Sequence, residues 1–197
     1  SLHLLTQADN FGSLIQINPQ EVKAIQIQRG SIWQEQQQRM KEQAEYLSRQ
    51  YHCVVTNPPY IGNKGMNTSL KQFLAKEYSI GKEDVFSAFI LRSALLTIPN
   101  GNIGFITPYV WLFIHSFRDL REHFIENYSL NNLVQLEYNA FGPAVVPVAT
   151  YTYTNTSELN NQGVYIKLSE FKGVDNQEPK TLEAIKNDVS YKYHVKN

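Results

Sequence analysis

The sequence predicts an α/β fold with a mostly parallel sheet, helices on both faces and an antiparallel strand near the C-terminus. Short apolar runs that end at proline or polar residues predict strands, and segments with helical periodicity lie between them. Strands that alternate with helices favour a parallel sheet covered on both faces. Hydrophobic residues make up 42% of the 197 residues, which suits a globular protein and excludes a disordered one.

The first third of the chain predicts a helix, a strand and a loop. Ser31–Gln34 fits a capping box, and apolar residues then recur at helical spacing as far as Leu47. His52–Thr56 is β-branched and is followed by two prolines, so we expect a buried strand in which Cys53 fills core space. A loop containing glycine and asparagine follows at Ile61–Thr68.

The rest of the chain continues the alternation of helices and strands. Helices are expected at Leu70–Leu74, Asp84–Ile98, Val110–Tyr128 and Thr181–Asn187. A turn is expected at Asn100–Asn102, and strands at Ile103–Thr107, Leu133–Leu136, Ala149–Thr154 and Val164–Ile166. The strand at Ala149–Thr154 could pair antiparallel with Leu133–Leu136.

Composition indicates how the chain divides into domains, what net charge it carries and where in the cell it is expected. We expect one domain at residues 1–156 and a polar extension at 157–197, cut from a longer protein because the chain opens without Met. Lys+Arg and Asp+Glu balance at 18 each, so the chain as a whole offers no positive charge to attract a polyanion. No apolar stretch could span a bilayer, no signal peptide is evident, and a single cysteine favours a reducing compartment. We therefore expect a cytoplasmic location and no membrane partner.

Asn57-Pro58-Pro59-Tyr60 carries the chemistry, because it directly follows a predicted strand. In open α/β sheets, ligands bind beyond the carboxyl ends of the strands. The Asn57 side-chain oxygen and the Pro58 carbonyl could accept the two hydrogens of a planar amine, and the Tyr60 ring could stack on it. An ordinary turn is the alternative, since Asn-Pro and Pro-Pro are common turn dipeptides.

In this setting the motif resembles that of the amino-methyltransferase superfamily. It is most similar to the gamma-type adenine-N6 DNA methyltransferases of restriction and phage-defence systems. Other stretches are similar to motifs of that family in the same order: Ala8–Gly12, Asp84–Phe89, Gly101–Pro108 and Asn139–Phe141. The longer pattern Asn57–Asn67 looks closest to the PglX methyltransferases of BREX phage-defence systems. The resemblance covers about residues 1–155 and implies a partial Rossmann-like methyltransferase sheet.

The resemblance implies S-adenosylmethionine as cofactor and DNA as substrate, with other defence proteins as possible partners. Asn57, Pro58, Pro59 and Tyr60 would form the catalytic motif, and Tyr60 and Phe141 would stack on the flipped adenine. Asp9, Phe11, Asp84 and Phe86 would contact the cofactor. No metal is implied, and the histidines His3, His115, His123 and His194 show no spacing typical of ligands.

The family's first motif, a glycine loop that grips the cofactor, has no counterpart in this sequence. We therefore expect the chain alone to be inactive and to bind cofactor weakly or not at all. Two alternative functions stay open at this point. One is a glutamine-N5 protein methyltransferase, which uses the same four residues on another planar amide. The other is a non-catalytic interaction module of a defence complex.

Overall fold

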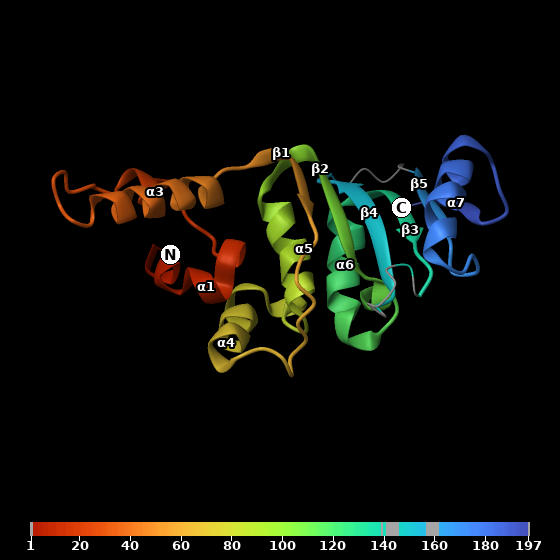
Figure 1. Ribbon diagram of the computed structural model, residues 1–197, viewed down its shortest axis with the longest axis horizontal. Coiled ribbons are helices and arrows are strands. Elements are labelled where there is room, and N and C mark those ends of the chain that lie inside the picture. The colour runs from red at the N-terminus through yellow and green to blue at the C-terminus, as the bar shows by residue number, and fades with distance from the viewer. Residues whose placement is uncertain (1, 139, 141–145, 157–161, 197) are drawn as a thin grey trace.

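The computed structural model describes residues 2–138, 140, 146–156 and 162–196, and its strands form one mixed sheet (Figure 1). The strand order is β1-β2-β4-β3-β5-β6. Pairing is parallel for β1–β2 and β3–β5 and antiparallel for β2–β4, β3–β4 and β5–β6, so β1, β2, β3 and β5 share one direction. The predicted α/β class, largely parallel with antiparallel strands, is confirmed.

All five predicted strands are present, with bounds that differ by a few residues. The strands are β1 (Tyr51–Thr56), β2 (Thr97–Pro108), β3 (Ser129–Gln135), β4 (Val148–Thr154), β5 (Gln162–Lys167) and β6 (Lys192–Lys196). The predicted antiparallel pairing of β4 with β3 is confirmed, and β4 also pairs with β2. Strand β6 was not predicted.

The expected turn at Asn100–Asn102 lies inside β2 as an irregularity of the strand. Asn100 has a φ of 63°, and the pairing register with β1 shifts between Tyr51 and Cys53. A Cβ on Gly101 would lie 2.5 Å from the side chain of Thr97, so only glycine fits this close approach.

The prediction that β1 is a buried strand is wrong. In the described residues β1 lies at the edge of the sheet and pairs with β2 alone. Val55 is 75% exposed above Gly104 and Thr152, and Cys53 is exposed, so Cys53 does not fill core space. An apolar β-branched run indicates a strand but does not show which of its faces another element covers.

Helices α5 (Val85–Leu95) and α6 (Arg118–Asn127) pack on one face of the sheet (Figure 1). Their side chains form a core with the alternate residues Ile103 and Phe105 of β2 and Tyr151 and Tyr153 of β4. On the opposite face Ala184 of α7 (Val174–Lys186) packs with Val134 and Ile166, so helices lie on both faces, the second face being covered over β3 and β5. The helix predicted at 181–187 is thus longer, and α7 includes Pro179.

The helix predicted from Val110 to Tyr128 is interrupted. Two 3₁₀ turns, η4 (Tyr109–Leu112) and η5 (His115–Phe117), precede α6. The Arg121 side chain donates to the carbonyls of Trp111 (2.6 Å) and Ile114 (2.7 Å), which satisfies acceptors that a continuous helix would use internally. Periodicity alone could not show this break.

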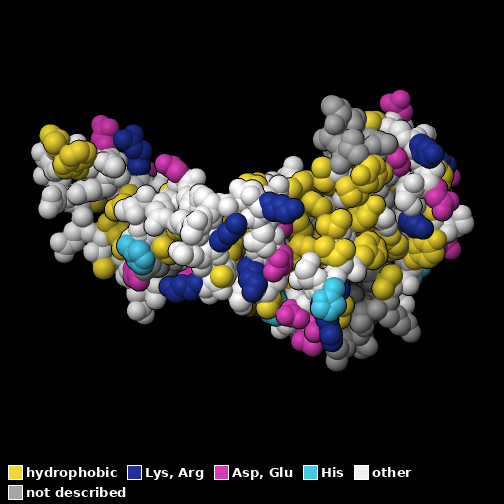
Figure 2. Space-filling view, turned by 90° about the horizontal axis from the view of Figure 1, so that it is seen from below, with side chains coloured by type: hydrophobic (Ala, Val, Ile, Leu, Met, Phe, Trp, Pro, Cys, Tyr) yellow, Lys and Arg dark blue, Asp and Glu magenta, His cyan; other side chains and the backbone are white. Residues whose placement is uncertain are grey.

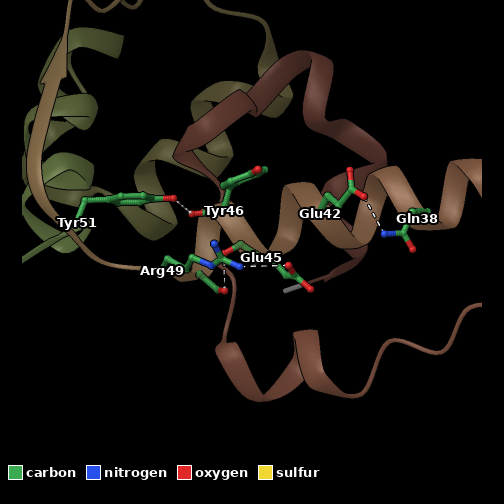
Figure 3. A network of polar contacts seen from close by, with 7 residues as sticks. Gln38, Glu42, Glu45, Tyr46, Arg49 and Tyr51 are labelled. Carbon is green, nitrogen blue, oxygen red and sulfur yellow. Dashed lines mark hydrogen bonds and ion pairs between the residues drawn. The ribbon is translucent and has the colours of Figure 1, made fainter.

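The N-terminal elements form a second core beside α5. They are η1 (Leu2–Gln7), α1 (Ala8–Phe11), η2 (Gly12–Leu14), α2 (Pro19–Lys23), α3 (Gln34–Ser48), α4 (Thr68–Glu77) and η3 (Ser79–Gly81). Helix α3 begins after the predicted capping box, where Ser31 accepts from the Trp33 N–H instead. Figure 3 shows the polar contacts along α3, including the Tyr51 hydroxyl that donates to the Tyr46 carbonyl (2.8 Å) and joins α3 to β1.

A buried arginine connects this second core to α5. Arg92 is 4% exposed and donates to the carbonyls of Ser13 (2.9 Å), Ile15 (2.9 Å) and Leu47 (2.7 Å). Burial lowers the pKa of its guanidinium from the ordinary value. One side chain on α5 thereby fixes both the stretch after α1 and the end of α3.

Candidate functional site

The four residues Asn57–Tyr60 leave the carboxyl end of β1 and line an open hollow of about 660 Å³. Ile106 of β2, Val146 and Val148 of β4 line the rest of it. Pro58 is buried, whereas Asn57, Pro59 and Tyr60 are exposed. The motif therefore follows the carboxyl end of a strand, as predicted, and its role in binding a ligand stays a prediction.

Tyr60 is held by contacts to Asn57 in its own loop, to one strand and to one helix. Its hydroxyl lies 3.1 Å from Oδ1 of Asn57 and 3.2 Å from the carbonyl oxygen of Ile106. Its ring meets the ring of Phe86 edge-on, with 6.3 Å between centroids and an interplanar angle of 87°. Burial raises the pKa of the Tyr60 hydroxyl, so this group is a neutral donor at ordinary pH.

These contacts fix what the motif can do chemically. The Asn57 amide oxygen and the Pro58 carbonyl are acceptors, and Pro58 has no N–H to compete for them. The Tyr60 ring supplies an apolar face at the same hollow. A planar group that carries an –NH₂ can use all three features. It must share Asn57 Oδ1 with the Tyr60 hydroxyl or displace that hydroxyl.

Asp84 joins the end of this loop to the start of α5. Its Oδ1 accepts from the N–H groups of Ile61 (3.0 Å) and Phe86 (3.2 Å), and the Ser87 hydroxyl accepts from the Asp84 N–H (3.3 Å) in a capping box. The Val85 N–H also donates to the Ile61 carbonyl (3.1 Å). Burial raises the pKa of the Asp84 carboxyl, although the backbone N–H groups oppose this shift.

The two residues predicted to contact cofactor on α5 differ in accessibility. Asp84 is half-buried, and its carboxylate already accepts from two backbone N–H groups. Phe86 is 1% exposed and packs between Tyr60 and Phe117. Asp84 and Phe86 therefore both hold the Asn57–Tyr60 loop in position. Their contact with the cofactor stays a prediction.

The other predicted cofactor residues line a different hollow. Asp9 is exposed and lines a hollow of about 360 Å³ with Gly12 and with Tyr46 of α3. Phe11 is buried and stacks on Phe73 of α4, with 4.2 Å between ring centroids. The structure does not place either residue among those that line the hollow at Asn57–Tyr60.

Phe141, predicted to stack on the base, lies outside the described residues. Ile106 and Val148 line the hollow and were not predicted as site residues. Since β2 runs parallel to β1 and ends at the same edge, the position of Ile106 two residues before Pro108 was the available signal.

The described residues include no helix long and apolar enough to cross a membrane. Over the same described part of the chain, no group of three or more metal-ligating side chains is found.

Comparison with known proteins identifies relatives of the sequence. Residues 2–141 match the family described as Eco57I restriction-modification methylase. The chain is 33% identical over 154 residues to the adenine-specific methyltransferase PglX of Lacticaseibacillus casei (strain Zhang), which covers 76% of this chain and 13% of that protein. It is 29% identical over 214 residues to the adenine-specific methyltransferase BrxX of Escherichia coli O9:H4 (strain HS), which covers 100% of this chain and 17% of that protein. The chain thus spans less than a fifth of either relative.

Solved structures resemble the fold. A nuclease-deletion mutant of the Type ISP restriction-modification enzyme LlaGI, in complex with a DNA substrate mimic, aligns with a TM-score of 0.61 at 14% identity. That alignment covers 89% of this chain and 17% of LlaGI. The methyltransferase subunit of a type I restriction-modification system from Streptococcus thermophilus aligns with a TM-score of 0.56 at 19% identity, covering 75% of this chain and 35% of the subunit. The predicted methyltransferase sheet and the predicted resemblance to PglX are confirmed.

Proposed function

Because the chain belongs to the Eco57I restriction-modification methylase family, we propose that it is part of the catalytic domain of a DNA methyltransferase. The full-length protein would transfer a methyl group from S-adenosylmethionine to N6 of adenine in DNA. One observation carries the proposal. Asn57, Pro58 and Tyr60 all line one open hollow at the carboxyl end of β1, where Asn57 and Pro58 supply acceptors and Tyr60 a ring.

The chemistry follows from these groups. The amino group of adenine cannot be reached within the base stack, so the base must be extruded into the hollow. Asn57 and Pro58 accept its two hydrogens, which turns the nitrogen lone pair away from the ring and toward the methyl donor. The Tyr60 ring stacks on the base and holds it in that orientation. S-adenosylmethionine, when bound, supplies an electrophilic methyl group, and catalysis by these residues is mainly by positioning.

The remaining site residues take roles that their contacts allow. We assign Asp9 to the cofactor, because its exposed carboxylate can accept from the O–H and N–H groups of an adenosine. Phe11 lies beside Asp9 but is buried against Phe73, so it would act by fixing the position of Asp9. Phe141 remains a proposed second stacking partner for the flipped base.

The partners and the compartment are part of the proposal. The LlaGI structure contains a DNA substrate mimic, and DNA is the partner that we propose for the full-length protein. The PglX and BrxX relatives favour a place in phage defence, with other defence proteins as further partners in the bacterial cytoplasm. The division into a catalytic portion at 1–156 and an extension at 157–197 also remains a proposal.

The two alternative functions are less favoured. A glutamine-N5 protein methyltransferase would need relatives that act on protein, whereas the relatives found are named as adenine-specific. A non-catalytic module has no reason to keep Asn57, Pro58 and Tyr60 arranged around an open hollow.

Methylation by the full-length protein tests the proposal. The wild type is incubated with labelled cofactor and DNA, and N6-methyladenine is measured by mass spectrometry. Asn57→Ala is expected to lower the rate on the order of 100-fold or more, as losses of one positioned hydrogen-bonding group in an active site do. Asn63→Ala, in the same loop, is the matched control and should keep wild-type activity. Methylation of a glutamine-containing peptide but not of DNA would overturn the assignment.

A further inference from the structure

A second open hollow, of about 490 Å³, lies at the same edge of the sheet as the Asn57–Tyr60 loop. Its lining consists of Phe113, Gln135, Tyr165, Lys167 and Tyr193. Gln135 and Lys167 are the last residues of β3 and β5, which run in the same direction as β1. Tyr193 is the second residue of the antiparallel β6, so it also lies at this edge.

The side chains that line this hollow are aromatic, amide and ammonium groups. Phe113 is 65% exposed and Tyr193 is 48% exposed. The rings of Tyr165 and Tyr193 are 5.9 Å apart between centroids, and the Tyr165 hydroxyl donates to Oε1 of Gln135. Lys167 is exposed beside them. The hollow therefore combines flat apolar faces with one hydrogen-bonding amide and one positive charge.

The two hollows are connected by a short series of contacts. Val146 and Val148 line the hollow at Asn57–Tyr60, and the carbonyl of Pro147 between them accepts from the Tyr109 N–H (3.0 Å). The Tyr109 ring packs edge-on against the ring of Phe113, with 6.0 Å between centroids. Pro147 and Tyr109 thus link the linings of the two hollows at this edge of the sheet. Figure 2, which shows the molecule from below, has a broad area of hydrophobic side chains on its right-hand, C-terminal half.

The chemistry of the lining favours a nucleotide over a segment of protein. Lysine is depleted in the cores of protein–protein interfaces, whereas aromatic rings beside a cation are typical of surfaces that bind single-stranded nucleic acid. Any base can stack on Phe113 or Tyr193, and the ammonium group of Lys167 can pair with the adjoining phosphate. Gln135 is buried and accepts from the Tyr165 hydroxyl, so it holds the Tyr165 ring in place.

We infer that this hollow binds a nucleotide that neighbours the target adenine on the same DNA strand. The exposed rings of Phe113 and Tyr193 stack on its base, and Lys167 pairs with its phosphate. The inference rests on the proposed function, which makes DNA the substrate. It adds a DNA subsite on β3, β5 and β6 to the catalytic hollow between β1, β2 and β4.

Photocrosslinking of the full-length protein tests the subsite without requiring turnover. The probe is a duplex of random sequence in which thymine is replaced by 5-iodouracil, and crosslinked peptides are identified by mass spectrometry. Crosslinks at Phe113 or Tyr193 are expected. Crosslinks elsewhere in the protein, with none at these two rings, would overturn the inference while leaving the proposed methylation untouched.

Kinetics provide the second measurement. Phe113→Ala and Tyr193→Ala should each raise the KM for DNA about fivefold or more, because base–aromatic stacking is lost, with kcat and the KM for cofactor changed less than about twofold. Trp33→Ala, at an exposed aromatic residue just before α3, is the matched control and should leave the KM for DNA unchanged. Unchanged KM values for DNA in both variants would overturn the subsite. So would variants that bind DNA normally but lose a bound partner protein, because the hollow would then bind protein. Absence of adenine methylation by the wild type would instead overturn the proposed function.

Discussion

Two stretches marked by the sequence as parts of the site, Asn57–Tyr60 and Ala8–Phe11, are positioned by different means. The first follows directly from β1 and is fixed by single polar contacts from Asp84 and Ile106. The second is a short helix placed by packing, since Phe11 stacks on Phe73 and the Asn10 amide pairs with the Asn67 amide.

This difference explains what each stretch can tolerate. A strand end has a defined direction and register, so the side chains that directly follow it have defined positions. A short helix outside the sheet is not held by strand pairing, so its position depends on packing against the surrounding core. Helix α5 contacts both stretches, because Phe86 in its first turn packs against Tyr60 and Arg92 binds the carbonyl of Ser13 after α1.

The largest expected effect comes from removing Arg92, which joins the two regions. Arg92→Ala would leave three carbonyls, those of Ser13, Ile15 and Leu47, without their donor. The Ile15 contact is buried and the other two are partly buried, so the full cost of about 1–3 kcal/mol for an unsatisfied buried group applies to the Ile15 carbonyl, and we expect at least that loss in the free energy of unfolding. Urea unfolding of the 197-residue chain measures it. Arg118→Ala, which removes an exposed ion pair on α6, is the control and should leave the midpoint unchanged. Equal midpoints for the two variants would show that Arg92 does not join the regions.

The same contrast separates what the sequence could predict from what it could not. The position of Asn57–Tyr60 was predictable, because a β-branched run followed by two prolines places the motif at a strand end. The exposure of Val55 was not, because the run looks the same whether or not a helix covers it. The interruption before α6 depends on Arg121, a side chain that reaches back to the carbonyls of Trp111 and Ile114. The buried role of Phe86 likewise depends on Phe117 and Tyr60, which are distant in sequence.

A smaller effect is expected at Asp9, which is exposed and is proposed to contact the cofactor. In the full-length protein, Asp9→Ala should raise the Kd for S-adenosylmethionine roughly tenfold or more, because a hydrogen bond to a charged group contributes about 1.5–3 kcal/mol. Isothermal titration calorimetry measures it, with Glu126→Ala on α6 as the control. Since Asp9 is exposed, its removal should not change the unfolding midpoint. A normal Kd would leave Asp9 without a role and would restrict the site to the region around β1.

Asp84 sharpens the comparison through its pH dependence. Burial raises the pKa of this carboxyl in the folded state above the ordinary value of 3.8. The folded state therefore binds the proton more tightly, and stability from this group is present below pH 3.8 and is lost as pH rises through the folded pKa. Asp84→Asn keeps an oxygen that can accept from Ile61 and Phe86 but cannot ionise. Its stability relative to the wild type should therefore increase as pH rises through that acidic window. Urea unfolding at a series of pH values measures it, and a difference that decreases with pH would contradict the assigned direction.

The smallest effect is expected for Tyr60→Phe. The hydroxyl of Tyr60 lies near Asn57 Oδ1 and the Ile106 carbonyl, whereas the proposed stacking uses only the ring. Removing the hydroxyl frees the Asn57 oxygen for the amino group of the base, and the Ile106 carbonyl faces an open hollow that water can enter. We expect kcat to change by less than about threefold, because a net hydrogen bond contributes only about 0.5–1.5 kcal/mol and the base replaces it. Tyr60→Ala, which removes the ring and its contact with Phe86, should lower methylation far more. Equal losses in the two variants would mean that the hydroxyl, rather than the ring, holds the base, and Tyr60 would then belong with the polar contacts that fix the loop.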